Sequence, residues 1–177
     1  MLGAAVVVVA IILILRSDVG PPPIVRGVMA PEFELPRLDA TDASLALSSF
    51  SGRVVLVNFW ASWCEPCERE MPAMERLYNA LPREDFELLA VAIDDKKADV
   101  RTFQDRYRLS FPILLDLDQT TYASYQTMGV PESILVDQEG RIVERYVGPR
   151  EWDADEYEDR IRELIGATRR VPEPSAF

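Results

Sequence analysis

Histidine is absent from this sequence, and cysteine occurs only twice in 177 residues. A structural zinc site needs about four Cys or His ligands, which two thiols do not supply. Covalent haem attachment uses the pattern C-x-x-C-H, but Glu68 follows the second cysteine. Without histidine, Ser-His and Cys-His catalytic pairs are excluded as well. We therefore expect no metal site and no bound cofactor.

Positive charge is also scarce, because 19 Lys and Arg stand against 30 Asp and Glu, which gives a net charge of −11. Nucleic-acid binding needs a clustered basic face, and anionic lipid attracts polybasic segments. Neither is visible here, so we expect no nucleic-acid partner and interpret the acidic excess as a solubilising surface. Apolar residues make up 48% of the chain, enough for the core of one domain.

The first fifteen residues carry no charged side chain and are mostly Val, Ile and Leu. As a helix they would span ~22 Å, slightly less than the ~30 Å of a hydrocarbon core. The basic residues and the clean A-x-A cleavage site of a signal peptide are missing. We interpret residues 1–15 as a membrane anchor or uncleaved signal anchor in contact with lipid. The alternative is a buried N-terminal strand or helix.

Three further segments follow this apolar run. Residues 16–26 contain Gly20 and three consecutive prolines, which is typical of a stiff tether. We expect one globular domain over residues 27–167 and a flexible polar tail over residues 168–177.

The hydrophobic pattern of the domain predicts an α/β fold. The unbroken run Val54–Val57 is typical of a strand buried on both faces, and apolar residues recur at helical spacing between Cys67 and Leu81. Alternating elements predict parallel pairing, and the last two strands form a hairpin. The predicted strands are 33–35, 53–60, 86–93, 111–115, 133–136 and 141–147. The predicted helices are 64–81, 98–107, 120–128, ended by Gly129, and 153–165, capped by Gly166.

The two cysteines lie where the first buried strand gives way to a helix. Helix N-termini carry unpaired N–H groups and partial positive charge, which stabilise a thiolate. C-x-x-C thiols accordingly titrate at ~3.5–7.5 rather than about 8.5. Pro66 suits the first helical turn. We predict thiol–disulfide exchange, with Cys64 as the exposed attacking thiol and Cys67 as the resolving thiol.

Four motifs of the sequence resemble one known family, the membrane-anchored thioredoxin-like proteins of the TlpA/ResA type, over residues 30–165. They are APEF at 30–33, VNFWASWCEPCEREMP at 57–72, GVPE at 129–132 and DQEGRIV at 137–143. The resemblance implies a thioredoxin fold, with a central mixed sheet flanked by helices, an N-terminal hairpin and a strand–helix insert around residues 90–111.

The resemblance also implies roles for single residues. Glu70 matches a glutamate that lies below the cysteines and couples to their titration, and Pro72 matches a helix kink. Pro131 matches a cis-proline that faces the cysteines and turns the Val130 backbone toward an extended substrate. Asn58 replaces the buried aspartate of ordinary thioredoxins. The expected substrate-binding residues are Trp63, Glu65, Pro66, Val130 and Pro131.

The same resemblance implies a place and partners for the protein. We expect a single-pass protein of the bacterial inner membrane whose domain faces the periplasm. Its clients are protein substrates with cysteine pairs, including apocytochrome c during cytochrome c biogenesis. A membrane thiol reductase is the expected electron donor.

Two other functions are weighed against this interpretation. A thiol peroxidase of the peroxiredoxin type needs Pro seven residues and Thr three residues before its cysteine, where this chain has Val57 and Ala61. A redox-inert membrane-anchored binding module or chaperone would not need both cysteines. As for direction, Glu65 and Glu70 place negative charge near the sulfurs, which disfavours the thiolate and favours a low-potential reductant.

Overall fold

The computed structural model describes residues 23–40, 43–94 and 96–168. The expected anchor at residues 1–15, residues 16–22 of the expected tether and residues 169–177 of the expected tail lie outside the described part. No helix among the described residues is long and apolar enough to cross a membrane.

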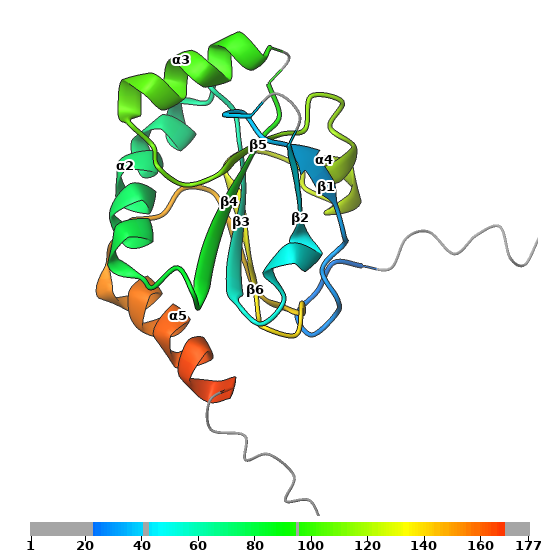
Figure 1. Ribbon diagram of the computed structural model, residues 1–177, viewed down its shortest axis with the longest axis vertical. Coiled ribbons are helices and arrows are strands. Elements are labelled where there is room, and N and C mark those ends of the chain that lie inside the picture. The colour runs from blue at the N-terminus through cyan, green and yellow to red at the C-terminus, as the bar shows by residue number, and fades with distance from the viewer. Residues whose placement is uncertain (1–22, 41–42, 95, 169–177) are drawn as a thin grey trace, which may run out of the picture.

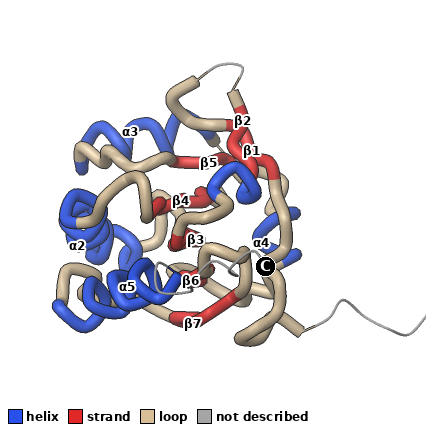
Figure 2. The backbone as a smooth tube through the Cα atoms, turned by 60° about the horizontal axis from the view of Figure 1, so that its bottom comes forward, coloured by secondary structure: helices blue, strands red, loops and turns tan. Residues whose placement is uncertain are grey.

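A five-stranded mixed sheet forms the centre of the domain, with the strand order β5-β4-β3-β6-β7 (Figure 2). β3 pairs in parallel with β4, and β4 pairs in parallel with β5, whereas β6 and β7 add antiparallel strands beyond β3. The predicted mixed pairing is therefore confirmed. The strands are β3 Val54–Trp60, β4 Phe86–Ala92, β5 Ile113–Leu115, β6 Glu132–Val136 and β7 Ile142–Val147.

Helices cover both faces of this sheet, so every residue of β3 and β4 is buried. Helices α2, α3 and α5 lie on one face, and α4 lies on the other together with the 3-10 helix η1 (Figures 1 and 2). This arrangement explains why β3 and β4 read as continuous apolar runs rather than alternating ones. The helices are α2 Glu65–Ala80, α3 Lys97–Tyr107, α4 Thr120–Ser124, α5 Asp155–Thr168 and η1 Leu47–Phe50.

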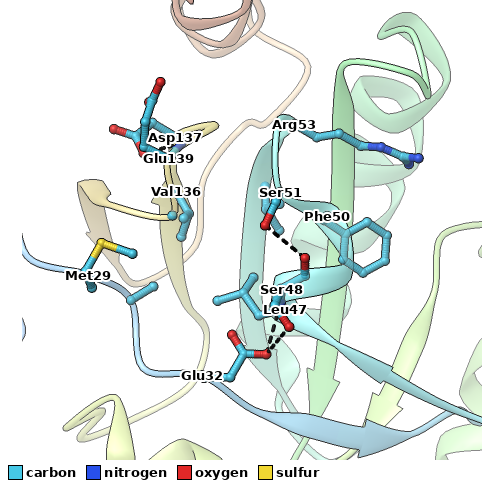
Figure 3. Close-up of a pocket in the computed structure, with 13 residues that line it drawn as sticks. Met29, Glu32, Leu47, Ser48, Phe50, Ser51, Arg53, Val136, Asp137 and Glu139 are labelled. Atoms are coloured by element: carbon cyan, nitrogen blue, oxygen red, sulfur yellow. Dashed lines mark hydrogen bonds between the residues drawn. The ribbon is translucent and has the colours of Figure 1, made fainter.

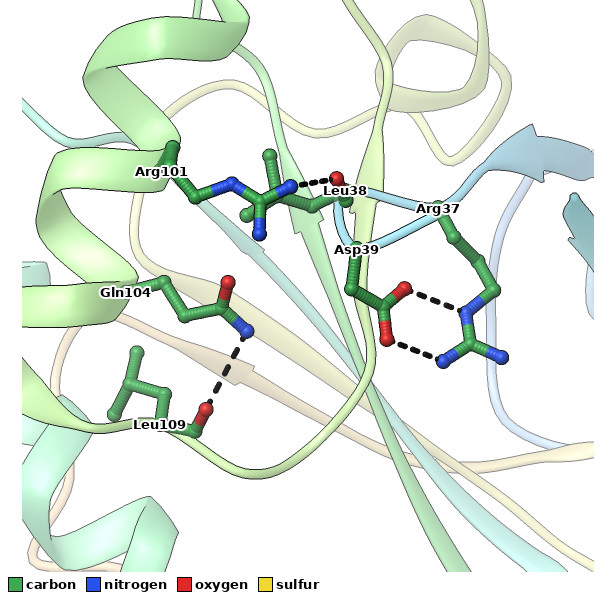
Figure 4. A network of polar contacts seen from close by, with 6 residues as sticks. All are labelled: Arg37, Leu38, Asp39, Arg101, Gln104 and Leu109. Carbon is green, nitrogen blue, oxygen red and sulfur yellow. Dashed lines mark hydrogen bonds and ion pairs between the residues drawn. The ribbon is translucent and has the colours of Figure 1, made fainter. Parts of the chain in front are cut away.

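The N-terminal hairpin and the insert helix implied by the resemblance are both present. Strands β1 Glu34–Pro36 and β2 Ser44–Ala46 pair antiparallel, and Arg37 bridges to Leu114 at the β5 edge. Figure 4 shows how α3 is fastened to this hairpin: the Arg101 guanidinium donates to the Leu38 carbonyl beside the ion pair of Arg37 with Asp39.

Two predicted helix ends are wrong. Helix α4 stops at Ser124 rather than at residue 128, because Tyr125 turns inward, where its ring lies 5.2 Å from that of Phe59 and its hydroxyl donates to Pro31 O. Helix α5 continues through Gly166 to Thr168. A glycine within a helix costs only about 1 kcal/mol, so it does not by itself end one.

Candidate active site

The two cysteines close a disulfide at the start of α2. Strand β3 ends at Trp60, and a turn closed by the Cys64 N–H donating to Ala61 O leads into the helix. Cys64 is the N-cap residue, and its Sγ accepts a hydrogen bond from the Cys67 N–H at 3.2 Å. The sulfur of Cys64 thus takes up one of the free N–H groups of the helix N-terminus, which is the interaction that stabilises a thiolate.

Access to the disulfide is narrower than the sequence predicted. Cys64 keeps 5% of its surface exposed and Cys67 none. Cys64 is therefore the more accessible of the pair, as expected for the attacking thiol, but it is far less exposed than expected. Both side chains belong to the hydrophobic core cluster, so neighbouring side chains cover them on most sides.

A cis-proline stands next to the end of β3. The Val130–Pro131 peptide bond is cis, as the resemblance implied. Pro131 immediately precedes β6, whose Glu132 pairs with Phe59 in β3, one residue before that strand ends. Because the cysteine-bearing turn leaves the same end of β3, residues 130–131 and the disulfide share one edge of the sheet.

The expected substrate-binding residues differ in exposure. Trp63 is 67% exposed and Glu65 is also exposed, whereas Pro66 and Val130 are half-buried and Pro131 is buried. Beside the cis-proline lies a surface hollow to which the exposed side chains of Met128 and Val147 contribute apolar surface. The residues lining it are Gln126, Met128, Gly129, Glu132, Arg145 and Val147.

Glu70 is a buried carboxyl group one helical turn after Cys67, only 3% exposed. Its two oxygens accept three hydrogen bonds inside the protein: from Asn58 Nδ2 at 3.1 Å, from the Arg150 N–H at 3.0 Å and from Trp152 Nε1 at 3.1 Å. Burial raises its pKa from 4.5 to about 7, although these donors act in the opposite direction. Residues three apart share one helix face, so Glu70 lies on the face of Cys67.

Glu70 also lines a surface cavity between α2 and the segment that joins β7 to α5. The lining residues are Arg69, Glu70, Ala73, Arg76, Pro149, Arg150 and Glu151. A solvated surface charge does not fit the burial of Glu70.

A second cavity lies far from the disulfide. Figure 3 shows it between the 29–32 segment, η1 and the end of β6, with Glu32 accepting hydrogen bonds from Ser48. It adjoins the start of β3, whereas the cysteines follow the end of that strand. It lacks cysteine, so we assign it no part in the redox chemistry.

Sequence reasoning missed several residues of the site. Trp152 donates a hydrogen bond to Glu70, which lies 82 residues earlier in the chain. Ser133 accepts one from Asn58, which lies 75 residues earlier. Asp94 follows β4 and binds the turn before Cys64. For Asp94 a signal existed, since an acidic residue directly after a buried parallel strand lies at the same sheet edge as the cysteines.

The fold and the cysteine pair together define a class, the thiol–disulfide oxidoreductases built on the thioredoxin fold. Residues 27–145 match the model of the AhpC/TSA family, and the chain belongs to that family, within its TlpA/ResA type. It is 34% identical over 122 residues to the thiol-disulfide oxidoreductase ResA of Bacillus thuringiensis strain Al Hakam, and 36% identical over 122 residues to that of Geobacillus kaustophilus. Each match spans 69% of both chains.

Solved structures agree with this assignment. A putative thiol:disulfide interchange protein DsbE from Chlorobium tepidum superimposes with a TM-score of 0.74 and 31% identity, covering 81% of this chain and 99% of that one. The thioredoxin domain of a thiol-disulfide oxidoreductase from Bacteroides vulgatus gives a TM-score of 0.69 and 27% identity, covering 80% and 98%.

Proposed function

We propose that this oxidoreductase works as a low-potential reductant of protein disulfides. The observation that carries the proposal is Glu70, a buried carboxyl group on the Cys67 face of α2 whose pKa is raised to about 7. When ionised, it opposes a second negative charge on the nearby sulfurs. A less stable thiolate means a less stable reduced form, so the pair gives up its electrons readily.

The reaction needs no group other than the cysteine pair. The Cys64 thiolate attacks one sulfur of the client disulfide, whose S–S bond breaks and whose other sulfur leaves as a thiolate that takes up a proton. Cys67 then loses its proton and attacks Cys64 in the mixed disulfide, which releases the second client thiol. Two electrons pass to the client, and the Cys64–Cys67 disulfide forms.

Replacing Glu70 by Gln tests the direction of this chemistry. The change removes the charge and keeps the shape, so the reduced form gains stability and the reduction potential rises, by up to ~30 mV for ~1.4 kcal/mol. The Cys64 thiolate also forms at lower pH. Because Glu70 is neutral well below pH 7, both differences should vanish near pH 5.5 and grow toward pH 8. Glutathione redox titrations and Cys64 alkylation rates, measured as pH series, follow them.

Glu65→Gln is the matched control, because Glu65 adjoins Cys64 but is exposed and paired with Arg69. Solvent screening should leave its effect smaller than that of Glu70→Gln. The two cysteines and Glu70 titrate as a coupled set, so whole titration curves are compared. Identical curves for the wild type and Glu70→Gln would remove the basis for the low potential.

We further propose that the domain works outside the cytoplasm, held by residues 1–15 to the inner membrane and re-reduced by a membrane thiol reductase. The apolar run of the sequence supports the anchor, and the ResA relatives support cysteine-bearing protein clients. Apocytochrome c before haem attachment is the client class that we favour.

Labelling in cells tests this location. With the outer barrier opened and the inner membrane intact, an impermeant thiol reagent should modify reduced Cys64. The Cys64→Ser/Cys67→Ser variant supplies the background. Modification that requires lysis of the inner membrane would place the domain in the cytoplasm. Deletion of residues 1–20 should give a folded domain that no longer sediments with membranes.

Two alternative activities are tested by the same preparations. We expect no thiol-dependent consumption of peroxide, because Val57 and Ala61 stand where a thiol peroxidase needs Pro and Thr. A redox-inert binding module or chaperone would keep its activity in the Cys64→Ser/Cys67→Ser variant, whereas the oxidoreductase loses it.

A further inference from the structure

A buried aspartate binds the turn from which Cys64 enters α2. Asp94, two residues after the end of β4 at Ala92, is 2% exposed. Its carboxylate accepts the Ser62 N–H at 2.9 Å on Oδ1 and at 3.0 Å on Oδ2, and Oδ1 also accepts the Ser62 hydroxyl. Both donor groups of one residue, two positions before the attacking cysteine, thus converge on one carboxylate.

The same turn is fastened to β4 through the backbone as well. The Ile93 N–H donates to Trp60 O at 3.0 Å, and the turn closes through the Cys64 N–H donating to Ala61 O at 3.1 Å. Trp60, Ser62 and Cys64 are therefore each held by hydrogen bonds. Those of Ser62 differ from the other two because their acceptor is a side chain, that of Asp94.

The end of β4 is itself well supported. The Asp116 N–H donates to Ala92 O at 2.9 Å, and Gln119 Nε2 donates to Ile93 O at 3.2 Å. Asp116 in turn accepts the N–H groups of Thr121 and Tyr122 in the first turn of α4. Asp94 thus projects from a rigid strand end, which suits a residue that has to hold a neighbouring loop in one position.

Burying the ionised carboxylate of Asp94 at this position costs free energy. The salt bridges of residues 23–40, 43–94 and 96–168 do not include Asp94. Burial, and to a smaller extent the nearby Asp99, raise its pKa, whereas the Ser62 donors and its own backbone act in the opposite direction. A buried charge without a cation needs strong hydrogen bonds, and the two charged oxygens of a carboxylate form stronger ones with an N–H and an O–H than a neutral acceptor does.

We propose that Asp94 is a positioning residue for the attacking thiol. By holding Ser62, it sets the turn so that the Cys64 sulfur meets the Cys67 N–H, which lies 3.2 Å away. This role goes beyond the activity of the cysteine pair. It is also independent of Glu70, which lies after Cys67 on α2 and makes none of these contacts.

The test measures the Cys64 thiolate directly in a Cys67→Ser background. Iodoacetamide alkylation is followed from pH 5 to 10 for Asp94→Ala, Asp94→Asn and Ser62→Ala, beside melting temperatures. Without the carboxylate the sulfur is capped less well, so its titration midpoint in Asp94→Ala should rise by about one pH unit and its rate at neutral pH should fall up to about tenfold. Asp94→Asn keeps one acceptor, and Ser62→Ala keeps the N–H bonds, so both should show smaller shifts in the same direction.

Asp99→Asn is the matched control, since it removes an exposed acidic charge near Asp94 without touching the turn. It should leave the alkylation profile unchanged. An unshifted midpoint in the Asp94 variants, even with a lower melting temperature, would make Asp94 a purely structural residue. A midpoint shifted to lower pH would show that its charge acts on the sulfur directly. Either result overturns the proposal, and if Asp94→Ala does not fold, Asp94→Asn and Ser62→Ala decide it.

Discussion

Replacing Cys67 by serine is expected to stop turnover and to trap client proteins as mixed disulfides on Cys64. Cys64 retains 5% exposure and its sulfur is capped by the helix N-terminus, so it attacks first, whereas Cys67 is fully buried and resolves the intermediate. Without the resolving thiol the covalent complex persists. Non-reducing electrophoresis, followed by identification of the trapped chains, measures this and names the clients.

Cys64→Ser is the matched control for trapping. Its remaining thiol, Cys67, lies beneath the surface, so complexes should be rare although turnover is lost equally. If Cys64→Ser trapped clients and Cys67→Ser did not, the roles of the two cysteines would be reversed. If neither variant trapped any protein while both lost turnover, the client would be a small disulfide rather than a protein.

Glu70→Gln is expected to change how the stability of the oxidised protein depends on pH. The pKa of Glu70 is 4.5 when exposed and about 7 in the fold. Between these values the unfolded chain releases a proton that the folded protein retains, so stability falls as pH rises and the full penalty is present above pH 7. The difference of 2.5 pKa units corresponds to roughly 3 kcal/mol.

Urea denaturation of the disulfide form at a series of pH values measures this effect. Asp94 and Asp116 also have raised pKa values and contribute in the same direction, so the quantity of interest is the difference between wild type and variant. That difference should shift in favour of Glu70→Gln by roughly 3 kcal/mol between pH 4 and pH 8. Glu65→Gln, at an exposed site, should run parallel to the wild type. A constant difference between wild type and Glu70→Gln would mean that Glu70 titrates normally.

The sequence predicted the redox centre well because its determinants are local. A buried strand, a short turn and a helix that begins with C-x-P-C place two sulfurs at a helix N-terminus within about fifteen residues. The cis-proline at Pro131 came from the family resemblance, since X-Pro bonds are cis in only ~5–6% of cases and nothing local marks this one.

The surroundings of Glu70 were beyond sequence reasoning. Its position after Cys67 indicated a shared helix face, but burial depends on Trp152 and the Arg150 backbone, which the closing segment brings from 80 or more residues away. Tyr125 shows the same limit in the fold. The sequence predicted a helix as far as residue 128, ended by Gly129, but the contacts of Tyr125 with Phe59 and Pro31 accompany the earlier end of α4 at Ser124.

The two polar atoms of the Asn58 amide differ in their hydrogen bonding. Its Nδ2 donates both to Glu70 Oε1 and to Ser133 Oγ, while Oδ1 has no partner within the described residues. That orientation suits an ionised Glu70. Once Glu70 takes up a proton, a half-turn of the Asn58 amide lets Oδ1 accept hydrogen bonds from the Glu70 carboxyl O–H and from the Ser133 hydroxyl instead. Asn58 can therefore respond to the proton of its neighbour by orientation alone, without carrying charge.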